Sequence, residues 1–327
     1  MRVFLSSPWV PAEWVRAHGH TPRGLWFAPD FRATLPVLPA LPAGTCMFAE
    51  QVVQFALRHP QDAVVFTTAC DQLRRGFDHA AETGAKQIFL FNLPATQTPA
   101  AARLYRAELE RLGQFLRERG GVAPAPENLR REMRQAEDIR RRLRASAPQA
   151  EARSFAAAVA KFWDEGIFSA PAAAPAARRV PLALAGGPFS AADWPLWDAI
   201  ETAGGRVVLN ATLTGERSLS PVLAERDRPL GALDDLTAGY FEHLTDVFQR
   251  PNTRLYDWLQ PRLAARAVRG IVLWHFTGCD LWRAEAQNLR EAFGLPVLPL
   301  EAGETPRLAP RDATRLQAFV ETLENDQ

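Results

Sequence analysis

The 327-residue sequence is poor in cysteine, with only Cys46, Cys70 and Cys279. An odd and sparse set of this kind excludes a disulfide scaffold, which needs an even and dense set. No two cysteines form a Cys-x-x-Cys pair, which argues against a zinc ribbon or a thioredoxin-like redox site. The three thiols therefore need another explanation.

The sequence also lacks long apolar runs and a dominant charge. No run reaches the roughly 18 apolar residues of a membrane-spanning helix, and Pro8 and Pro11 interrupt the N-terminal segment before a signal-peptide core can form. The net charge of +1 predicts no broad field for nucleic acid or membrane. We therefore expect a cytoplasmic protein without nucleic-acid or membrane partners. The 47% hydrophobic content suffices for folded domains.

Short apolar runs alternate with helical patterns, which predicts an α/β fold with parallel sheets. Strands are expected at 2–6, 24–28, 63–68, 87–93, 180–185, 206–210, 270–276 and 295–300. Helices are expected at 11–18, 46–59, 71–83, 99–119, 126–144, 155–165, 190–203, 234–248, 253–267, 281–293 and 310–323. The run AVVFTT is typical of a strand that is buried on both faces of a sheet.

The middle of the chain is helical and ends in a Pro/Ala linker, APAAAPAARR, at residues 170–179. We therefore predict an N-terminal α/β domain at 1–98, a helical segment with this linker at 99–178, and a C-terminal α/β domain at 179–327. The helical segment carries 12 Arg against 7 Asp and Glu between Arg103 and Arg144. These charges are interspersed as on a solvated helix face, so we do not expect a nucleic-acid arm.

The cysteines occupy junctions between strands and helices. Cys70 and Cys279 each follow a predicted strand, open a helix and precede an aspartate, and Cys46 starts a helix. In open parallel sheets, ligands bind beyond the carboxyl ends of the strands, and a helix N-terminus lowers the pKa of a thiol. The positions fit a soft-metal site for an iron–sulfur cluster, zinc or Cu(I). Alternatively, each cysteine is an inert buried thiol.

The sequence resembles the 2-hydroxyacyl-CoA dehydratase / benzoyl-CoA reductase subunit family over nearly its whole length. The similar segments are PWVPAEWVRAHGHTPRGLW at the start, GTCMFAE around Cys46, VVFTTACDQLRR around Cys70, LALAGGPF at 182–189, IVLWHFTGCDLWRAEAQNLREAFGLPVLPLEAG around Cys279, and TRLQAFVETL at 314–323. Their order and the use of all three cysteines carry the resemblance.

The resemblance implies two flavodoxin-like domains joined by a helical segment. It also implies a [4Fe–4S] cluster on Cys46, Cys70 and Cys279, with one iron open to a substrate or another ligand. Family members pair two related three-cysteine subunits, and an ATP-dependent activator iron–sulfur protein injects an electron. In the dehydratases the electron enters the carbonyl of an acyl-CoA thioester, and the resulting radical expels the 2-hydroxyl group.

Three functions stay open at this point. The first is a radical lyase subunit acting on a 2-hydroxyacyl-CoA, with a benzoyl-CoA reductase-type subunit as the variant. The second is a non-catalytic subunit that relays electrons or holds a heterodimer or homodimer together. The third is a binding protein with zinc or no metal at the cysteines. Gly186-Gly187-Pro188 lacks the ending of a Walker motif, so ATP would bind to the activator.

Several other residues are candidates. Ser6 and Ser7 follow the first strand, and we take Ser7 as the catalytic hydroxyl that reaches the open iron or a substrate hydroxyl. His275 could donate to a cluster sulfur. The remaining expectations are structural: Glu13 on an exposed helix face, solvated turn histidines at 18 and 20, helix-capping aspartates at 71 and 280, and a tight turn or phosphate contact at Gly186 and Gly187.

Overall fold

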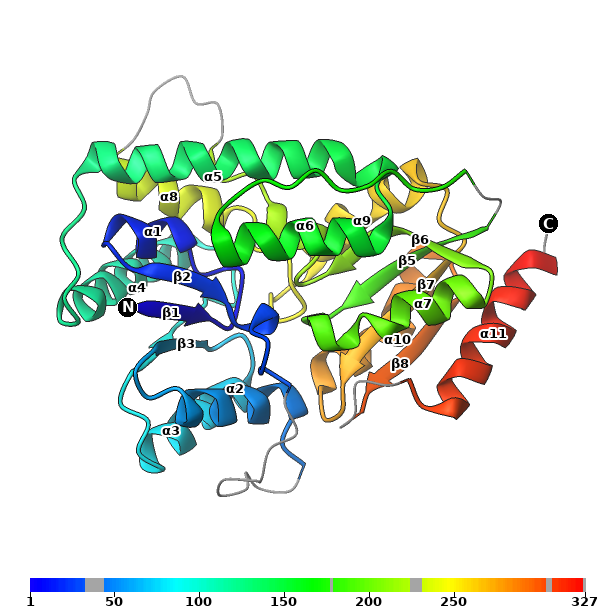
Figure 1. The fold of residues 1–327 in the computed structure, drawn as a ribbon, viewed down its shortest axis with the longest axis horizontal. Coiled ribbons are helices and arrows are strands. Elements are labelled where there is room, and N and C mark those ends of the chain that lie inside the picture. Colours follow the sequence, from blue (N-terminus) through cyan, green and yellow to red (C-terminus); the bar gives the residue numbers. More distant parts are fainter. Residues whose placement is uncertain (33–43, 177–178, 224–230, 304–307, 326–327) are drawn as a thin grey trace.

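Two four-stranded, all-parallel sheets form the framework of the molecule in a computed structural model, which describes residues 1–32, 44–176, 179–223, 231–303 and 308–325 (Figure 1). The first sheet has the order β2-β1-β3-β4 and the second the order β6-β5-β7-β8. The strands are β1 (Arg2–Leu5), β2 (Thr21–Gly24), β3 (Ala63–Thr67), β4 (Ile88–Phe91), β5 (Val180–Gly186), β6 (Gly205–Thr212), β7 (Gly270–Phe276) and β8 (Val297–Ala302). The chain has the predicted α/β fold of two flavodoxin-like domains, with the same strand order in each.

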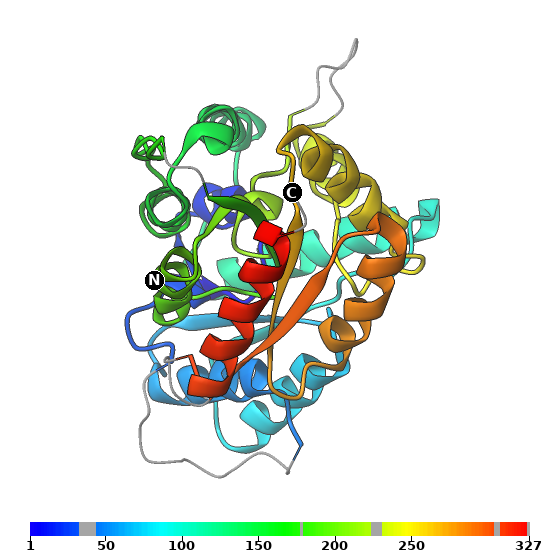
Figure 2. The ribbon, with the colours of Figure 1, turned by 90° about the vertical axis from the view of Figure 1, so that its right-hand side faces the viewer.

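Helices cover both sheets and fill the segment between them. They are α1 (Ala12–Ala17), α2 (Met47–Arg58), α3 (Asp71–Glu82), α4 (Pro99–Arg117), α5 (Pro126–Ser146), α6 (Ala152–Glu165), α7 (Pro195–Thr202), α8 (Ala232–Phe241), α9 (Thr253–Ala265), α10 (Asp280–Phe293) and α11 (Pro310–Asn325). Figure 2 shows α10 and α11 on opposite faces of the second sheet. Within the described ranges, every helix is too short or too polar to span a lipid bilayer.

The strand order sets the place of the candidate site. In each sheet the chain reverses its winding direction between two neighbouring central strands, β1 and β3 in the first sheet and β5 and β7 in the second. Ligands of open α/β sheets bind beyond the carboxyl ends of the strands at this reversal. Four short segments follow these four strands: Ser6-Ser7, Thr68–Cys70, Gly187-Pro188 and Thr277–Cys279.

Buried polar contacts tie the parts of the chain together. Arg32, which follows the first two strands, forms a buried ion pair with Asp193 and donates to the carbonyl of Gly303 (2.7 Å), both in the C-terminal half. Glu13 on α1 accepts from Arg140 on α5 and from the hydroxyl of Tyr240 on α8 (2.6 Å). The helical segment therefore packs on both α/β units through ion pairs as well as apolar contacts.

Most predicted elements differ from the observed ones by a few residues at their ends, and three predictions were wrong to a larger extent. The strand expected at 24–28 lies earlier, as β2, and residues 25–27 form a 3₁₀ turn because Trp26 packs edge-on against Trp163 of α6. The helix expected at 234–248 ends at Phe241, and the residues after it line the cavity described below. The helix expected to run from a Ser190 cap to 203 is split: Ser190 forms a capping box with Asp193, as expected of a cap, but it opens a short 3₁₀ helix, and α7 begins only at Pro195.

The described part of the Pro/Ala linker forms no helix or strand, and Ala173 forms an isolated antiparallel bridge with Ala150. Residues 177–178 of the linker lie outside the described residues. The element order is consistent with boundaries near 98 and 178, which remain predictions.

Candidate metal centre

The three cysteines meet at the carboxyl ends of the central strands, each at the residue that precedes a helix. Cys46 precedes α2, Cys70 precedes α3 and Cys279 precedes α10. All three line an inner cavity of about 70 Å³, and all three also line an adjoining outer cleft of about 510 Å³. The thiols therefore form a wall that is shared by a small apolar space and a larger open one.

A close approach of two backbone segments brings Cys46 and Cys279 together. The amide of Met47 donates to the carbonyl of Thr277 (3.1 Å). Gly278 has a φ of +79°, and a Cβ built on it would lie 3.0 Å from the Cα of Cys46. Glycine at this position therefore lets the second sheet approach the Cys46 segment without a steric conflict or backbone strain.

The three thiols and their surroundings shift one another's pKa values. Cys279 donates a hydrogen bond to the sulfur of Cys46, which, together with the backbone amides of the first turn of α2, lowers the pKa of Cys46 to about 7. The same hydrogen bond raises the pKa of Cys279, and burial adds to this shift. Burial raises the pKa of Cys70 to about 11, against the opposing effect of the Leu73 amide, which donates to its sulfur (3.4 Å). Ligation of all three sulfurs would thus release protons.

The inner cavity has an apolar wall with a few polar groups. Its larger apolar side chains are those of Phe48, Leu73, Leu213, Val247, Phe248, Phe276, Leu281 and Trp282. Its hydroxyl groups belong to Ser6, Ser7 and Thr67, all buried. The Ser7 oxygen accepts from the amide of Trp9 (3.3 Å), so its own O–H remains a donor. Within the described ranges, the hydroxyls of Ser6 and Thr67 have no hydrogen-bond partner.

A buried ion pair that the sequence did not reveal also borders the inner cavity. The carboxylate of Asp246 lines the cavity and accepts from the indole of Trp9 (3.1 Å) and from the amide of Val247 (2.7 Å). It pairs with Arg217 at 3.0 Å, and both side chains are almost fully buried. Asp246 was missed because it falls within a segment, 234–248, that looked like one amphipathic helix. Thr67, by contrast, could have been found from its position at the end of a strand.

The outer cleft is more polar and open to solvent. Its polar side chains are Thr68, Asp71, Gln72, Arg75, Arg250 and Asp280. Gln72 accepts from the amide of Cys46 (3.4 Å), which links the first turn of α3 to the start of α2. Asp71 and Asp280 do not cap their helices as expected: the capping positions belong to Cys70 and Cys279, and both carboxylates are exposed.

Other candidate residues lie away from the cysteines. Glu13 is fully buried, not exposed as expected; burial opposes its ionisation, but the Arg140 charge and hydrogen bond prevail and lower its pKa. His18 and His20 are likewise buried, where they bond to the carbonyls of Trp14 and Leu116. His275 is buried and faces Glu301 (3.9 Å) but does not line either cavity.

Gly186 and Gly187 form a tight turn. A Cβ on Gly186, at a φ of +136°, would overlap the carbonyl of Trp274 in β7, and the amide of Gly187 donates to that same carbonyl (3.2 Å). The turn lines the inner cavity through Gly187 and Pro188.

Among the described residues, no three His, Cys, Asp or Glu side chains lie close enough to hold a single metal ion. An iron–sulfur cluster makes a different demand, because each thiolate binds a different iron at the rim of a larger body. Three soft thiols on the wall between the small cavity and the open cleft, each at the start of a helix, fit that demand.

One comparison with known proteins bears on this chain. The family model described as 2-hydroxyglutaryl-CoA dehydratase, D-component, matches residues 9–323. No curated protein matches the sequence. Because the family model covers nearly the whole chain, including all three cysteines, the chain belongs to the 2-hydroxyglutaryl-CoA dehydratase D-component family.

Proposed function

We propose that this chain binds a [4Fe–4S] cluster through Cys46, Cys70 and Cys279 and is the cluster-bearing subunit of a 2-hydroxyacyl-CoA dehydratase-like lyase. The observation that carries the proposal is the convergence of the chain's only cysteines, from both sheets, on one wall between two cavities. Membership of the family supports the same function.

When bound, the cluster would supply a low-potential electron and, at the iron without a cysteine, a Lewis acid. The residues of the chain determine what can reach that iron. The inner cavity, at about 70 Å³, has room for only a few atoms, such as a carbonyl or hydroxyl group. The outer cleft, at about 510 Å³, lies within the size range of small-molecule pockets and could hold a larger part of an acyl-CoA.

Ser7 is the proposed catalytic hydroxyl. Its oxygen is fixed by the amide of Trp9, and its O–H can donate into the inner cavity. A hydrogen bond from Ser7 to the 2-hydroxyl group would stabilise negative charge on that group as it leaves. The apolar walls around it would exclude water during the reaction.

The remaining components would come from other proteins. The sequence carries no Walker motif, so an ATP-dependent activator iron–sulfur protein would deliver the electron. A related three-cysteine subunit would complete a heterodimer, or a second copy of this chain a homodimer.

The metal content of the protein tests the proposal. Anaerobic purification and reconstitution should give about four irons and as much acid-labile sulfide per chain. Cys46→Ser, Cys70→Ser and Cys279→Ser should each lose most of the iron, whereas Thr277→Ser, in the same loop as Cys279, should keep it because it retains the hydroxyl that donates to the carbonyl of Ala302. Fewer than about two irons per chain in the unmodified protein, or zinc without sulfide, would contradict the proposal.

The reaction itself needs the complete system. With the activator, ATP and the partner subunit, a 2-hydroxyacyl-CoA should be converted to the enoyl-CoA. Reduction of an aromatic acyl-CoA instead would indicate the reductase-type subunit, and a cluster that is reduced without any turnover on this chain would indicate an electron-relay subunit.

A further inference from the structure

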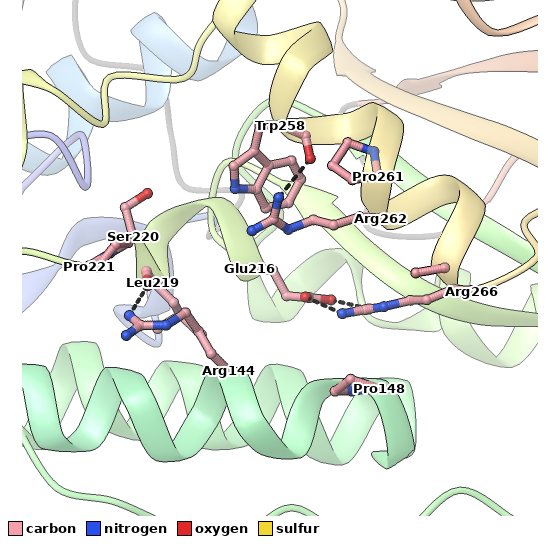
Figure 3. Close-up of a pocket in the computed structure, with 11 residues that line it drawn as sticks. Arg144, Pro148, Glu216, Leu219, Ser220, Pro221, Trp258, Pro261, Arg262 and Arg266 are labelled. Atoms are coloured by element: carbon pink, nitrogen blue, oxygen red, sulfur yellow. Dashed lines mark hydrogen bonds and ion pairs between the residues drawn. The ribbon is translucent and has the colours of Figure 1, made fainter.

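A third cavity, of about 460 Å³, lies apart from the cysteines and shares no lining residue with their two cavities. Figure 3 shows it between the C-terminal end of α5, the turn Glu216–Leu219 and one face of α9. Three arginines, Arg144, Arg262 and Arg266, face it, together with one carboxylate, Glu216. Trp258 and Pro261 contribute to its apolar wall.

Two of the three arginines are already paired. Arg266 binds Glu216 with both terminal nitrogens, each at 2.6 Å (Figure 3). Arg144 binds Glu137 at 2.6 Å and the carbonyl of Leu219 at 2.6 Å. The carboxylates around the cavity are therefore committed to these two guanidinium groups.

Arg262 is different. One terminal nitrogen donates to the carbonyl of Trp258 (2.8 Å), and the guanidinium group lies 4.2 Å from the centroid of the Trp258 ring. No carboxylate of the described residues lies within ion-pair distance of Arg262, and its Nε and second terminal nitrogen donate to no described residue. These two nitrogens form the edge that binds phosphate or carboxylate in a bidentate manner. Trp258 thus positions the guanidinium group of Arg262 and leaves this edge free to bind a ligand.

The local field favours an added anion. Arg262 is half-buried, and burial is the main cause that lowers its pKa; the charge of Glu216 opposes this, and the charges of Arg266 and Arg144 lower the pKa further. A ligand with negative charge would relieve the repulsion between these guanidinium groups.

We infer that this cavity binds the phosphate group of a small organic phosphate, of the size of a diphosphate ester. The free edge of the Arg262 guanidinium group would bind the phosphate oxygens. Arg144 and Arg266 would add to the positive electrostatic potential, and the apolar wall would contact the organic part of the ligand. The volume of about 460 Å³ is within the range of small-molecule sites. This inference does not depend on the proposed reaction at the cysteines.

Isothermal titration of the full chain tests the inference with pyrophosphate and ADP as probes, adenosine as the uncharged control, and coenzyme A as a second source of diphosphate. We expect pyrophosphate and ADP to bind and adenosine not to. Arg262→Gln should weaken the binding of ADP by about tenfold or more, as expected for the loss of a charge-assisted pair.

Arg262→Lys should bind ADP more tightly than Arg262→Gln but less tightly than the unmodified protein, because lysine restores the charge but not the two parallel donors of the guanidinium group. The matched control is Arg254→Gln, on the same helix but outside the cavity, where the arginine also donates to a backbone carbonyl. Binding of coenzyme A much more tightly than ADP, with that affinity lowered in Arg262→Gln, would identify the diphosphate at this cavity as part of a coenzyme A group, and equal binding would indicate a separate nucleotide. Absence of binding by all phosphates, or equal affinity in the Arg262→Gln variant with an unchanged circular dichroism spectrum, would overturn the inference.

Discussion

Replacement of Gly278 by alanine tests whether the close contact between the two cysteine loops is required. The new methyl group would lie 3.0 Å from the Cα of Cys46 and 3.2 Å from its amide nitrogen, where backbone cannot easily yield. The residue has a φ of +79°, which adds roughly 1–2 kcal/mol of backbone strain for alanine. Overpacking of a closed contact costs about 1–3 kcal/mol more. We therefore expect Gly278→Ala to destabilise the protein by about 2–5 kcal/mol.

Gly294 provides a matched control for this substitution. It has a similar φ of +64°, at the end of α10, but no atom lies within 4 Å of its built Cβ. Gly294→Ala should therefore show only the strain of about 1–2 kcal/mol. The assay is urea unfolding of the cluster-free protein, combined with iron content after reconstitution. If Gly278→Ala loses no more stability than Gly294→Ala and retains its iron, the two loops do not form the contact described.

Three further predictions concern individual side chains. Ser7→Ala should leave the iron content unchanged but lower the dehydration rate about tenfold, as expected for the loss of one hydrogen bond. The rate is measured in a turnover assay with the activator and the partner subunit. An unchanged rate would exclude a catalytic role for Ser7. Asp246→Asn should lower the free energy of unfolding by about 3–5 kcal/mol because it leaves Arg217 buried without a counter-charge. The control Asp198→Asn removes an exposed carboxylate and should change the free energy of unfolding by less than about 1 kcal/mol. Equal effects of the two substitutions in urea unfolding would be inconsistent with a buried pair. The pKa of Glu13 is lowered in the folded state, so the ionised carboxylate stabilises the fold fully above the pKa of glutamate in the unfolded chain, about 4.3, and this stabilisation is lost as the pH falls through the folded-state pKa. When the free energy of unfolding is measured against pH in acid, Glu13→Gln should show a smaller decline than the unmodified protein. An equal decline in both proteins would refute the role of Glu13 in this pH dependence.

The strands and the cysteine positions could be predicted from the sequence because their signals are local. Cys70 lies three residues after the end of β3, and Cys279 lies three residues after the end of β7, so rules for strand ends and helix starts apply directly. The sheet edge that gathers these residues follows from parallel strand order, which the alternation of strands and helices predicts.

The buried ionic groups could not be predicted in this way. Glu13 and Arg140 are 127 residues apart, and only the packing of α1 on α5 makes them neighbours. Arg217, in the short 3₁₀ helix Glu216–Leu219, and Asp246, in the loop after α8, also become neighbours only in the complete tertiary structure. A polar residue on a short helix therefore looks exposed when its partner is distant in the sequence.

The measurement that tests the central claim most directly is the Mössbauer spectrum of the protein reconstituted with ⁵⁷Fe under anaerobic conditions. Three cysteine ligands on a [4Fe–4S] cluster predict two iron environments in a ratio of about three to one, with the minor one altered by an added ligand. Four equivalent irons, or iron without a cluster signature, would contradict the assignment of Cys46, Cys70 and Cys279 as a three-cysteine site with one open position.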